Sequence, residues 1–459
     1  MLLWLILRKG LGLIYSKKII KGSFFTSRTD KEVYFVKDAL IETDDNGEIT
    51  KIINPADQDY QRTLEDAKEN KQLVETRDDE YVLPGFIDLH VHAPQWPQAG
   101  LALDQPLNEW LEQYTFPLEA KYQDLEFARK SYRHLTRNLV KNGTTTALYF
   151  GTIHEDANLI LAEECQHVGQ RAFIGQVVMD NPEQTPKYYR DSSTKEALNK
   201  TIDFIKQIRT LYQDSDLIQP VVTPRFVPNC TDEALEGLGQ IAKKFDVLVQ
   251  SHCSESDWEH GYAIERFGKT DTEVLKQYGL LNEKSVMAHG TLLTEANMDT
   301  FKDEKAAIAH CPISNAYFGN AVLPTRKLLE RKIKVGIGTD ISGGFSSSMY
   351  RNIQQALISS RMLEDGVDAQ KPAAERGVAG ARISAKQAFY MATIGGAEAL
   401  HIRAGQIKVG FKADLQIVRD ELSAISSNAS QDVFERLMYQ TNADNISKVF
   451  VSGKLVDHK

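Results

Sequence analysis

Four apolar segments in this 459-residue chain end in histidine or aspartate, and this pattern strongly constrains the fold. The residues at these ends are the pair His90 and His92, then His252, His289 and Asp340. In a parallel β/α barrel, the carboxyl ends of strands that lie far apart in sequence meet on one face, where catalysis takes place. Imidazoles with one carboxylate and no thiolate suit a catalytic zinc that keeps an open coordination position. The pattern therefore predicts a metal-dependent hydrolase.

The middle of the chain alternates apolar strand candidates with amphipathic helices, which is typical of a parallel sheet. Helices are expected at residues 125–141, 194–211, 231–244 and 294–301. The eight strand candidates span residues 82–91, 144–150, 172–179, 219–224, 246–251, 285–288, 306–309 and 334–338. They predict an α/β fold, a closed (β/α)8 barrel of the TIM type. The alternative is an open doubly wound sheet, which would spread the polar strand ends along too wide an edge.

Both ends of the chain are rich in short β-like runs. The turn sequence at residues 44–47 separates two such runs and predicts a hairpin. The polar stretch 57–70 predicts a surface helix, and the β-rich texture returns after residue 403. We therefore predict a small β-sandwich domain built from residues 1–83 and 403–459, around a catalytic domain at 84–402.

Charge and cysteine content narrow the class of partner. The net charge of -9 argues against a surface that follows nucleic-acid phosphates and favours a small-molecule substrate. The four cysteines contain no CxxC pair, which excludes a disulfide framework and a thiolate zinc site and is typical of a cytoplasmic protein. It also excludes the cysteine-rich zinc site of deaminases that act on bases in nucleic acid. These cysteines are Cys165, Cys230, Cys253 and Cys311.

The first seven residues are apolar, and Arg8 and Lys9 end this apolar run. A membrane span needs about 20 apolar residues, and the features of a signal peptide are missing. We predict a poorly ordered or incidental extension over residues 1–16 and no membrane partner. A weak membrane or targeting role is the alternative.

Two histidines spaced as in His90 and His92 point to the same side of a strand and can bind one ion together. The pair is weak evidence alone, and the later strand ends make it strong. Glu255 follows His252 by three residues, so its carboxylate can overhang the metal and carry a proton during hydrolysis. The alternative for Glu255 is a surface residue that begins the next helix. His310 also ends a strand, and a supporting or structural role is favoured for it.

Eight motifs then occur in a consistent order between about residues 84 and 350: PGFIDLHVHAPQ, LNEWLEQYTFP, KNGTTTALYFGTIH, VTPRF, SHCSE, VMAHG, AHCPISN and GTDISGG. Together they closely resemble the guanine deaminase family of the amidohydrolase superfamily. Many members of the superfamily share the metal-binding pattern, whereas LNEWLEQYTFP and TPRF are specific to guanine deaminases. The resemblance implies a zinc-dependent aminohydrolase of purine catabolism that converts guanine to xanthine and ammonia, and a homodimer.

The resemblance also implies roles for individual residues. One zinc per chain would be bound by His90, His92, His252 and Asp340. Asp340 would also take a proton from the attacking water, and His289 would help to orient that water or the tetrahedral intermediate. Two-metal relatives use a modified lysine at the fourth strand. That strand lacks a lysine here, which predicts a single metal.

The purine is expected to be held by its carbonyl edge and its ring face. The resemblance assigns substrate contacts to Gln95, Arg225, Phe226, His92, His252 and Glu255. Glu255 would carry a proton to the ring nitrogen and to the departing ammonia. Arginine and glutamine donors suit the oxo group of guanine, whereas adenine carries a donor at that position. Trp110 is expected either to line the pocket or to pack in the core, and Trp96 departs from the smaller or phenolic residues of relatives.

Two other functions remain open at this point. One is a related deaminase that acts on another purine or on a triazine-like ring, or an amidohydrolase acting on a cyclic amide. The other is a metal-free barrel with a binding or structural role, which the complete set of ligands disfavours.

Overall fold

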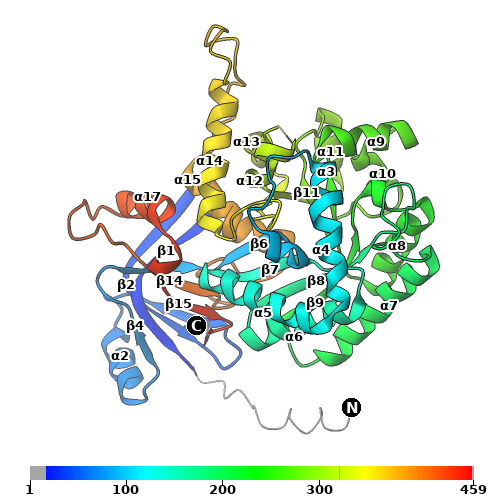
Figure 1. The fold of residues 1–459 in the computed structure, drawn as a ribbon. Helices are drawn as coiled ribbons and strands as arrows, with labels where there is room; N and C mark the ends of the chain where they lie inside the picture. The colour runs from blue at the N-terminus through cyan, green and yellow to red at the C-terminus, as the bar shows by residue number, and fades with distance from the viewer. Residues whose placement is uncertain (1–16, 320, 457–459) are drawn as a thin grey trace.

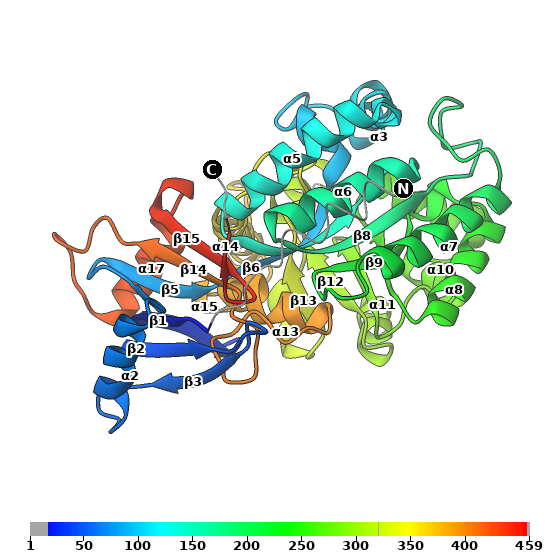
Figure 2. The same cartoon turned by 90° about the horizontal axis from the view of Figure 1, so that it is seen from below.

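A computed structural model describes residues 17–319 and 321–456 (Figure 1). The apolar segment at residues 1–7, for which we predict an extension, lies outside the described residues. The chain builds a barrel of eight parallel strands beside a second eight-stranded sheet (Figures 1 and 2). No helix in the described ranges is both long and apolar enough to cross a membrane.

The barrel strands follow one another in sequence order around the sheet, and every neighbouring pair is parallel. They are β6 (Phe86–His92), β7 (Thr144–Phe150), β8 (Arg171–Val178), β9 (Ile218–Pro224), β10 (Leu248–Cys253), β11 (Ser285–His289), β12 (Ala307–His310) and β13 (Lys334–Ile337). The backbone N–H of Asp340 donates to the carbonyl of His90 at 2.8 Å, and that of His92 donates to Ile341 at 2.8 Å. These bonds link the first strand to the segment after the last one, so the predicted barrel is confirmed and the open sheet is not.

Helices cover the outside of the barrel, as Figure 1 shows. The predicted helices at 125–141, 194–211, 231–244 and 294–301 are present as α5, α7, α8 and α11, with small shifts at their ends. Each begins at a residue whose side chain accepts a backbone N–H of the first turn. The α-helices are α2 (Tyr60–Glu69), α3 (Leu107–Trp110), α4 (Phe116–Ala120), α5 (Leu125–Lys141), α6 (Glu155–Val168), α7 (Thr194–Leu211), α8 (Asp232–Phe245), α9 (Asp257–Phe267), α10 (Asp271–Gln277), α11 (Glu295–Asp303), α12 (Pro312–Ser314), α13 (Thr325–Glu330), α14 (Met349–Asp365), α15 (Ala385–Tyr390), α16 (Gly396–Ala399) and α17 (Ser430–Gln440).

The two chain ends share the second sheet, in the order β16-β15-β14-β5-β1-β2-β3 with β4 beside β1. A small β domain made from both termini is therefore confirmed, and its strands form a single hydrogen-bonded sheet. The predicted hairpin joins β2 and β3 in antiparallel pairing, and α2 fills the predicted helical stretch. The strands are β1 (Ile19–Thr29), β2 (Glu32–Thr43), β3 (Ile49–Ile53), β4 (Leu73–Glu75), β5 (Glu80–Pro84), β14 (Leu415–Arg419), β15 (Ile446–Val451) and β16 (Lys454–Leu455).

The prediction of one strand over residues 82–91 is wrong. Pro84 ends β5 in the small sheet, and Phe86 begins β6 in the barrel. Gly85 lies between them, where an added Cβ would come within 2.2 Å of the Thr145 side chain. The apolar sequence is continuous because both strands are buried, so it conceals the change of sheet.

Candidate active site

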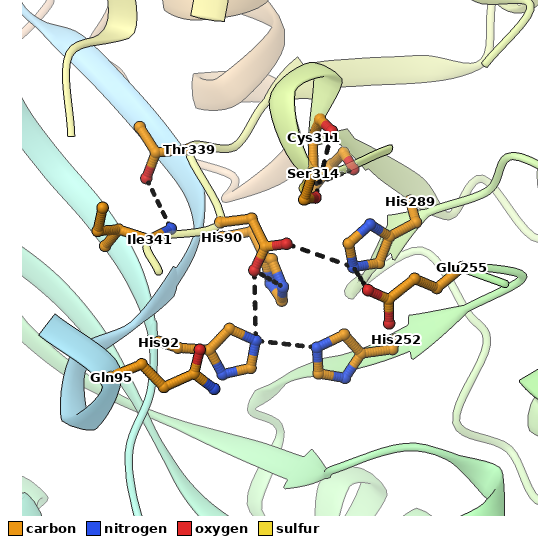
Figure 3. A network of polar contacts seen from close by, with 12 residues as sticks. His90, His92, Gln95, His252, Glu255, His289, Cys311, Ser314, Thr339 and Ile341 are labelled. Atoms are coloured by element: carbon orange, nitrogen blue, oxygen red, sulfur yellow. Dashed lines mark hydrogen bonds and ion pairs between the residues drawn. The ribbon is translucent and has the colours of Figure 1, made fainter. Parts of the chain in front are cut away.

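The strand-end residues singled out in the sequence converge on one buried cluster (Figure 3). Nε2 of His92 lies 2.9 Å from Nε2 of His252. The Asp340 carboxylate lies 3.2 Å from Nε2 of His90 and 3.5 Å from Nε2 of His92. His289 completes the group, with Nε2 4.0 Å from Asp340 Oδ2. Strand topology therefore brings together residues as far apart in sequence as His90 and Asp340.

Neighbouring carbonyl and amide groups set the tautomers of two of these imidazoles. Nδ1 of His252 lies 2.6 Å from the Arg225 carbonyl, which can only accept, so Nδ1 carries the proton. Nδ1 of His289 donates to the side-chain oxygen of Asn315 at 2.8 Å. In both residues Nε2 is left with its lone pair facing the cluster. Such outer hydrogen bonds orient the histidine ligands of metal sites.

Burial keeps the cluster histidines neutral. Burial, followed by the neighbouring imidazoles, holds the pKa of His90, His92 and His252 well below the ordinary value. Burial also lowers the pKa of His289. A metal ion needs neutral imidazole, so the low pKa values leave these side chains in the form that ligates.

Several of these polar atoms lack a protein partner. Nε2 of His90 and Nε2 of His289 are buried and accept no hydrogen bond. Lone pairs and a carboxylate that face one another without donors repel, and buried unpaired polar atoms are costly. A cation that binds among them removes both penalties. The donor set of nitrogen and carboxylate oxygen fits a zinc ion.

The backbone at the strand ends is also unusual. Ser254, His289 and Asp340 have positive φ angles of 54°, 78° and 51°. Non-glycine residues seldom adopt this conformation, which costs about 1–3 kcal/mol and clusters at functional sites. The turn away from the strand aims the His289 and Asp340 side chains at the common centre.

Phe150 lies within the motif KNGTTTALYFGTIH, but the sequence alone indicated no role for it. It ends β7, and its ring centroid lies 4.7–4.9 Å from those of His90, His92 and His252. The ring fills the space on one side of the imidazoles and restricts their rotation. Its place at a strand end beside the ligand-bearing strand is the signal that could have identified it.

Glu255 lies just past β10, beside the cluster. Its Oε1 is 3.5 Å from Nε2 of His289, and its backbone N–H donates to Glu259 at 2.7 Å. The residue precedes α9 and is buried, so the alternative of an exposed helix start is wrong. Burial, and then the nearby charge of Asp340, raises the pKa of Glu255 well above its ordinary value. This shift favours the protonated carboxyl, which is the form that a proton donor needs.

A small cavity opens beside the metal cluster. It is lined by the predicted contact residues Gln95, Arg225 and Phe226. Glu255 and three residues of the metal cluster also line it. Trp110 also lines it, while its Nε1 donates to the Leu101 carbonyl and its ring packs 5.3 Å from Phe318. Trp110 thus serves both the pocket and the core. The lining residues are His92, Gln95, Leu107, Trp110, Leu111, Arg225, Phe226, His252, Glu255, Phe318, Asp340 and Gly343.

Glu119 is the second functional residue that the motif analysis missed. It is fully buried in α4 and accepts both Arg225 Nη1 at 2.6 Å and Gln95 Nε2 at 2.9 Å. Its only sequence signal is one acidic residue in an otherwise apolar short helix. His310, by contrast, lies outside the groups that could hold a metal, and burial lowers its pKa to about 3.

Comparisons with known proteins agree with this geometry. The sequence model of the amidohydrolase family matches residues 81–456. A guanine deaminase of Mus musculus is 34% identical over 451 residues, which cover 95% of this chain and 96% of that protein. The guanine deaminase of Escherichia coli is 31% identical over 389 residues, 82% of this chain and 80% of that one. A crystal structure of guanine deaminase from C. acetobutylicum with guanine in the active site superposes with a TM-score of 0.86 and 30% identity, covering 96% of this chain and 100% of that one.

Proposed function

The chain belongs to the amidohydrolase family, and we propose that within it the protein is a zinc-dependent guanine deaminase. The observation that carries the proposal is one cavity lined by both the metal cluster and an arginine–aromatic pair. Its relatives named guanine deaminase match the chain over nearly its full length. The reaction consumes guanine and water and releases xanthine and ammonia.

The metal ligands proposed are His90, His92, His252 and Asp340. Zinc, when bound, would lower the pKa of water and stabilise developing negative charge. The neutral imidazoles and the unpartnered Nε2 of His90 support this ligand set. One zinc per chain is proposed because the fourth strand, β9, carries no lysine to bridge a second ion.

The protein's own groups then bind the base and move protons. The Arg225 guanidinium donates to the ring carbonyl, and the Phe226 ring covers one face of the base. Asp340 takes a proton from the attacking water. Glu255, whose raised pKa favours a protonated carboxyl, gives its proton to the ring nitrogen, regains one from the hydroxyl of the tetrahedral centre and passes that proton to the leaving amino group. The proton held by Asp340 then restores the Glu255 carboxyl. His289 lies between these two carboxylates and orients the oxygen of the tetrahedral centre.

An ammonia-release assay on a panel of bases and nucleosides tests this function. Guanine should be the preferred substrate. Adenine should be poor because its amino group would face the donors of Arg225, and guanosine should be poor because the cavity is small. Preference for another purine, or for a triazine ring, would replace guanine as the substrate while leaving the chemistry in place.

We also propose a cytoplasmic homodimer that acts in purine catabolism. Four free, buried cysteines support a reducing compartment. The α14 helix projects from the body in Figure 1 and carries Ile358 and Met362, which are 50% and 49% exposed. Apolar side chains exposed on such an arm support an association surface. Sedimentation of the wild type beside Ile358→Asp tests it, and a monomeric wild type would refute it.

A further inference from the structure

A buried carboxylate stands behind the substrate-binding wall of the cavity. Glu119 Oε2 accepts Arg225 Nη1 at 2.6 Å, while its Oε1 accepts Arg225 Nη2 at 3.1 Å and Gln95 Nε2 at 2.9 Å. Glu119 is 0% exposed and does not line the cavity. It reaches the substrate only through the two residues that it binds.

We propose that Glu119 is a positioning residue that makes the cavity read a ring lactam, a carbonyl acceptor next to a ring N–H donor. It does so by fixing which groups Arg225 and Gln95 leave free. The inference rests on the proposed function and deepens it, because guanine carries such a lactam edge and 2-aminopurine does not.

The Arg225 guanidinium has more N–H donors than Glu119 accepts. A guanidinium has five N–H groups in a planar fork. The two-pronged pairing with Glu119 takes one hydrogen from each terminal nitrogen. Nη1 also donates to Sδ of Met179 at 3.6 Å. The other hydrogens point away from the carboxylate, so Arg225 can meet a ring carbonyl with donors alone.

The glutamine side follows from the charge on Glu119. An ionised carboxylate only accepts, so the Gln95 amide must turn its nitrogen toward it. Turning the amide over would set its oxygen against the carboxylate and leave two buried acceptors without a proton between them. Glu119 therefore selects one of the two amide orientations.

The consequence is visible at the other end of the amide. Oε1 of Gln95 is buried and has no hydrogen-bond partner. Gln95 lines the cavity beside His92, so this oxygen can accept a hydrogen bond from a molecule bound there (Figure 3). Our expectation from sequence was that Gln95 donates to the oxo group. The structure directs one N–H of the Gln95 amide to Glu119 and leaves its oxygen for a ring N–H.

The experiment compares guanine with 2-aminopurine, which carries the same leaving group but neither the oxo group nor the adjacent N–H. The measured quantity is the ratio of kcat/KM for the two bases in wild type, Glu119→Gln and Gln95→Met. If 2-aminopurine is not turned over, the KM for guanine is compared with the inhibition constant of 2-aminopurine. Zinc content is measured for every variant.

Glu119→Gln should lower the guanine preference about 10- to 100-fold, because guanine loses oriented hydrogen bonds that 2-aminopurine never makes. Gln95→Met should lower it about tenfold and covers the case in which Glu119→Gln fails to fold. The matched control is Glu164→Gln. Glu164 is a buried carboxylate that pairs with Arg129 and Arg133 away from the cavity, and this variant should keep the wild-type ratio.

The outcomes separate the two proposals. A wild type that releases no ammonia from guanine overturns the proposed function. An active wild type whose preference for guanine is unchanged in Glu119→Gln and in Gln95→Met overturns the role of Glu119 alone. Equal losses for both bases would reduce Glu119 to a structural residue and also overturn it.

Discussion

The two walls of the cavity satisfy their polar atoms in opposite ways. On the metal wall, neutral imidazoles and a carboxylate converge, and Nε2 of His90 and of His289 has no hydrogen-bond partner. On the substrate wall, Glu119 pairs with Arg225 and Gln95 at hydrogen-bond distances. The first wall presents lone pairs that an ion can occupy, whereas the second is held in place by protein groups and leaves Oε1 of Gln95 without a partner.

This difference separates the demands of the two tasks. A metal site requires several lone pairs aimed at one point, which is costly until the ion binds. A recognition site requires donors and acceptors whose orientations are set before the substrate arrives. The comparison therefore predicts that variants on the metal wall abolish turnover, whereas variants on the substrate wall change selectivity.

The largest effect is expected at Asp340. Asp340→Ala removes both a proposed ligand and the proposed acceptor of the water proton, so turnover should fall by about 10⁴-fold or more. Elemental analysis should find close to one zinc per wild-type chain and less in the variant. Asp420→Ala is the matched control because Asp420 is also a buried carboxylate but pairs with Arg436 in the small domain. Two metals per wild-type chain would contradict the single-zinc proposal, and an active Asp340→Ala would contradict the role proposed for Asp340.

Glu255→Gln should follow in size and should separate chemistry from binding. The amide keeps the shape of the side chain but cannot transfer a proton, so turnover should fall by about 10²–10⁴-fold. Zinc content and guanine affinity should stay near the wild-type values. Loss of zinc would make Glu255 part of the metal wall, and near-normal turnover would assign the proton transfer to Asp340 or His289.

A smaller loss is expected for the arginine of the substrate wall. Arg225→Ala removes a donor to the ring carbonyl, which should cost about 1–3 kcal/mol in kcat/KM for guanine. It also leaves the Glu119 charge buried without its partner, which should lower the free energy of unfolding by about 3–5 kcal/mol. The double variant Arg225→Met with Glu119→Met should recover part of that stability without recovering the preference for guanine. Unchanged kinetics in Arg225→Ala would show that this wall does not bind the base.

The metal wall could be predicted from sequence and the substrate wall only in part. Each ligand ends a local apolar segment, so the barrel topology predicts that His90 and Asp340 meet. Glu119 lies in the short helix α4, 106 positions from Arg225, and no local pattern links the two. The break at Gly85 within the predicted strand 82–91 was also missed, because both flanking strands are fully buried.

The smallest effect is expected at His310. It tests whether burial keeps an imidazole neutral outside the proposed metal ligands as well. Burial lowers the pKa of His310 to about 3, against 6.5 for the ordinary value. Below pH 6.5 the unfolded chain therefore takes up a proton that the folded chain refuses, and stability falls as the pH falls through this window. The slope is about 1.4 kcal/mol per pH unit, so acidification from pH 6.5 to 5 should cost the wild type about 2 kcal/mol at this residue.

His310→Asn lacks this titration. Its free energy of unfolding, measured by denaturant melts, should therefore fall by about 2 kcal/mol less than that of the wild type over the same interval. His134→Asn, at an exposed histidine, is the control for the substitution itself. Parallel curves for wild type and His310→Asn would mean that His310 titrates alike in the folded and unfolded chain and would confine the neutral imidazoles to the metal wall.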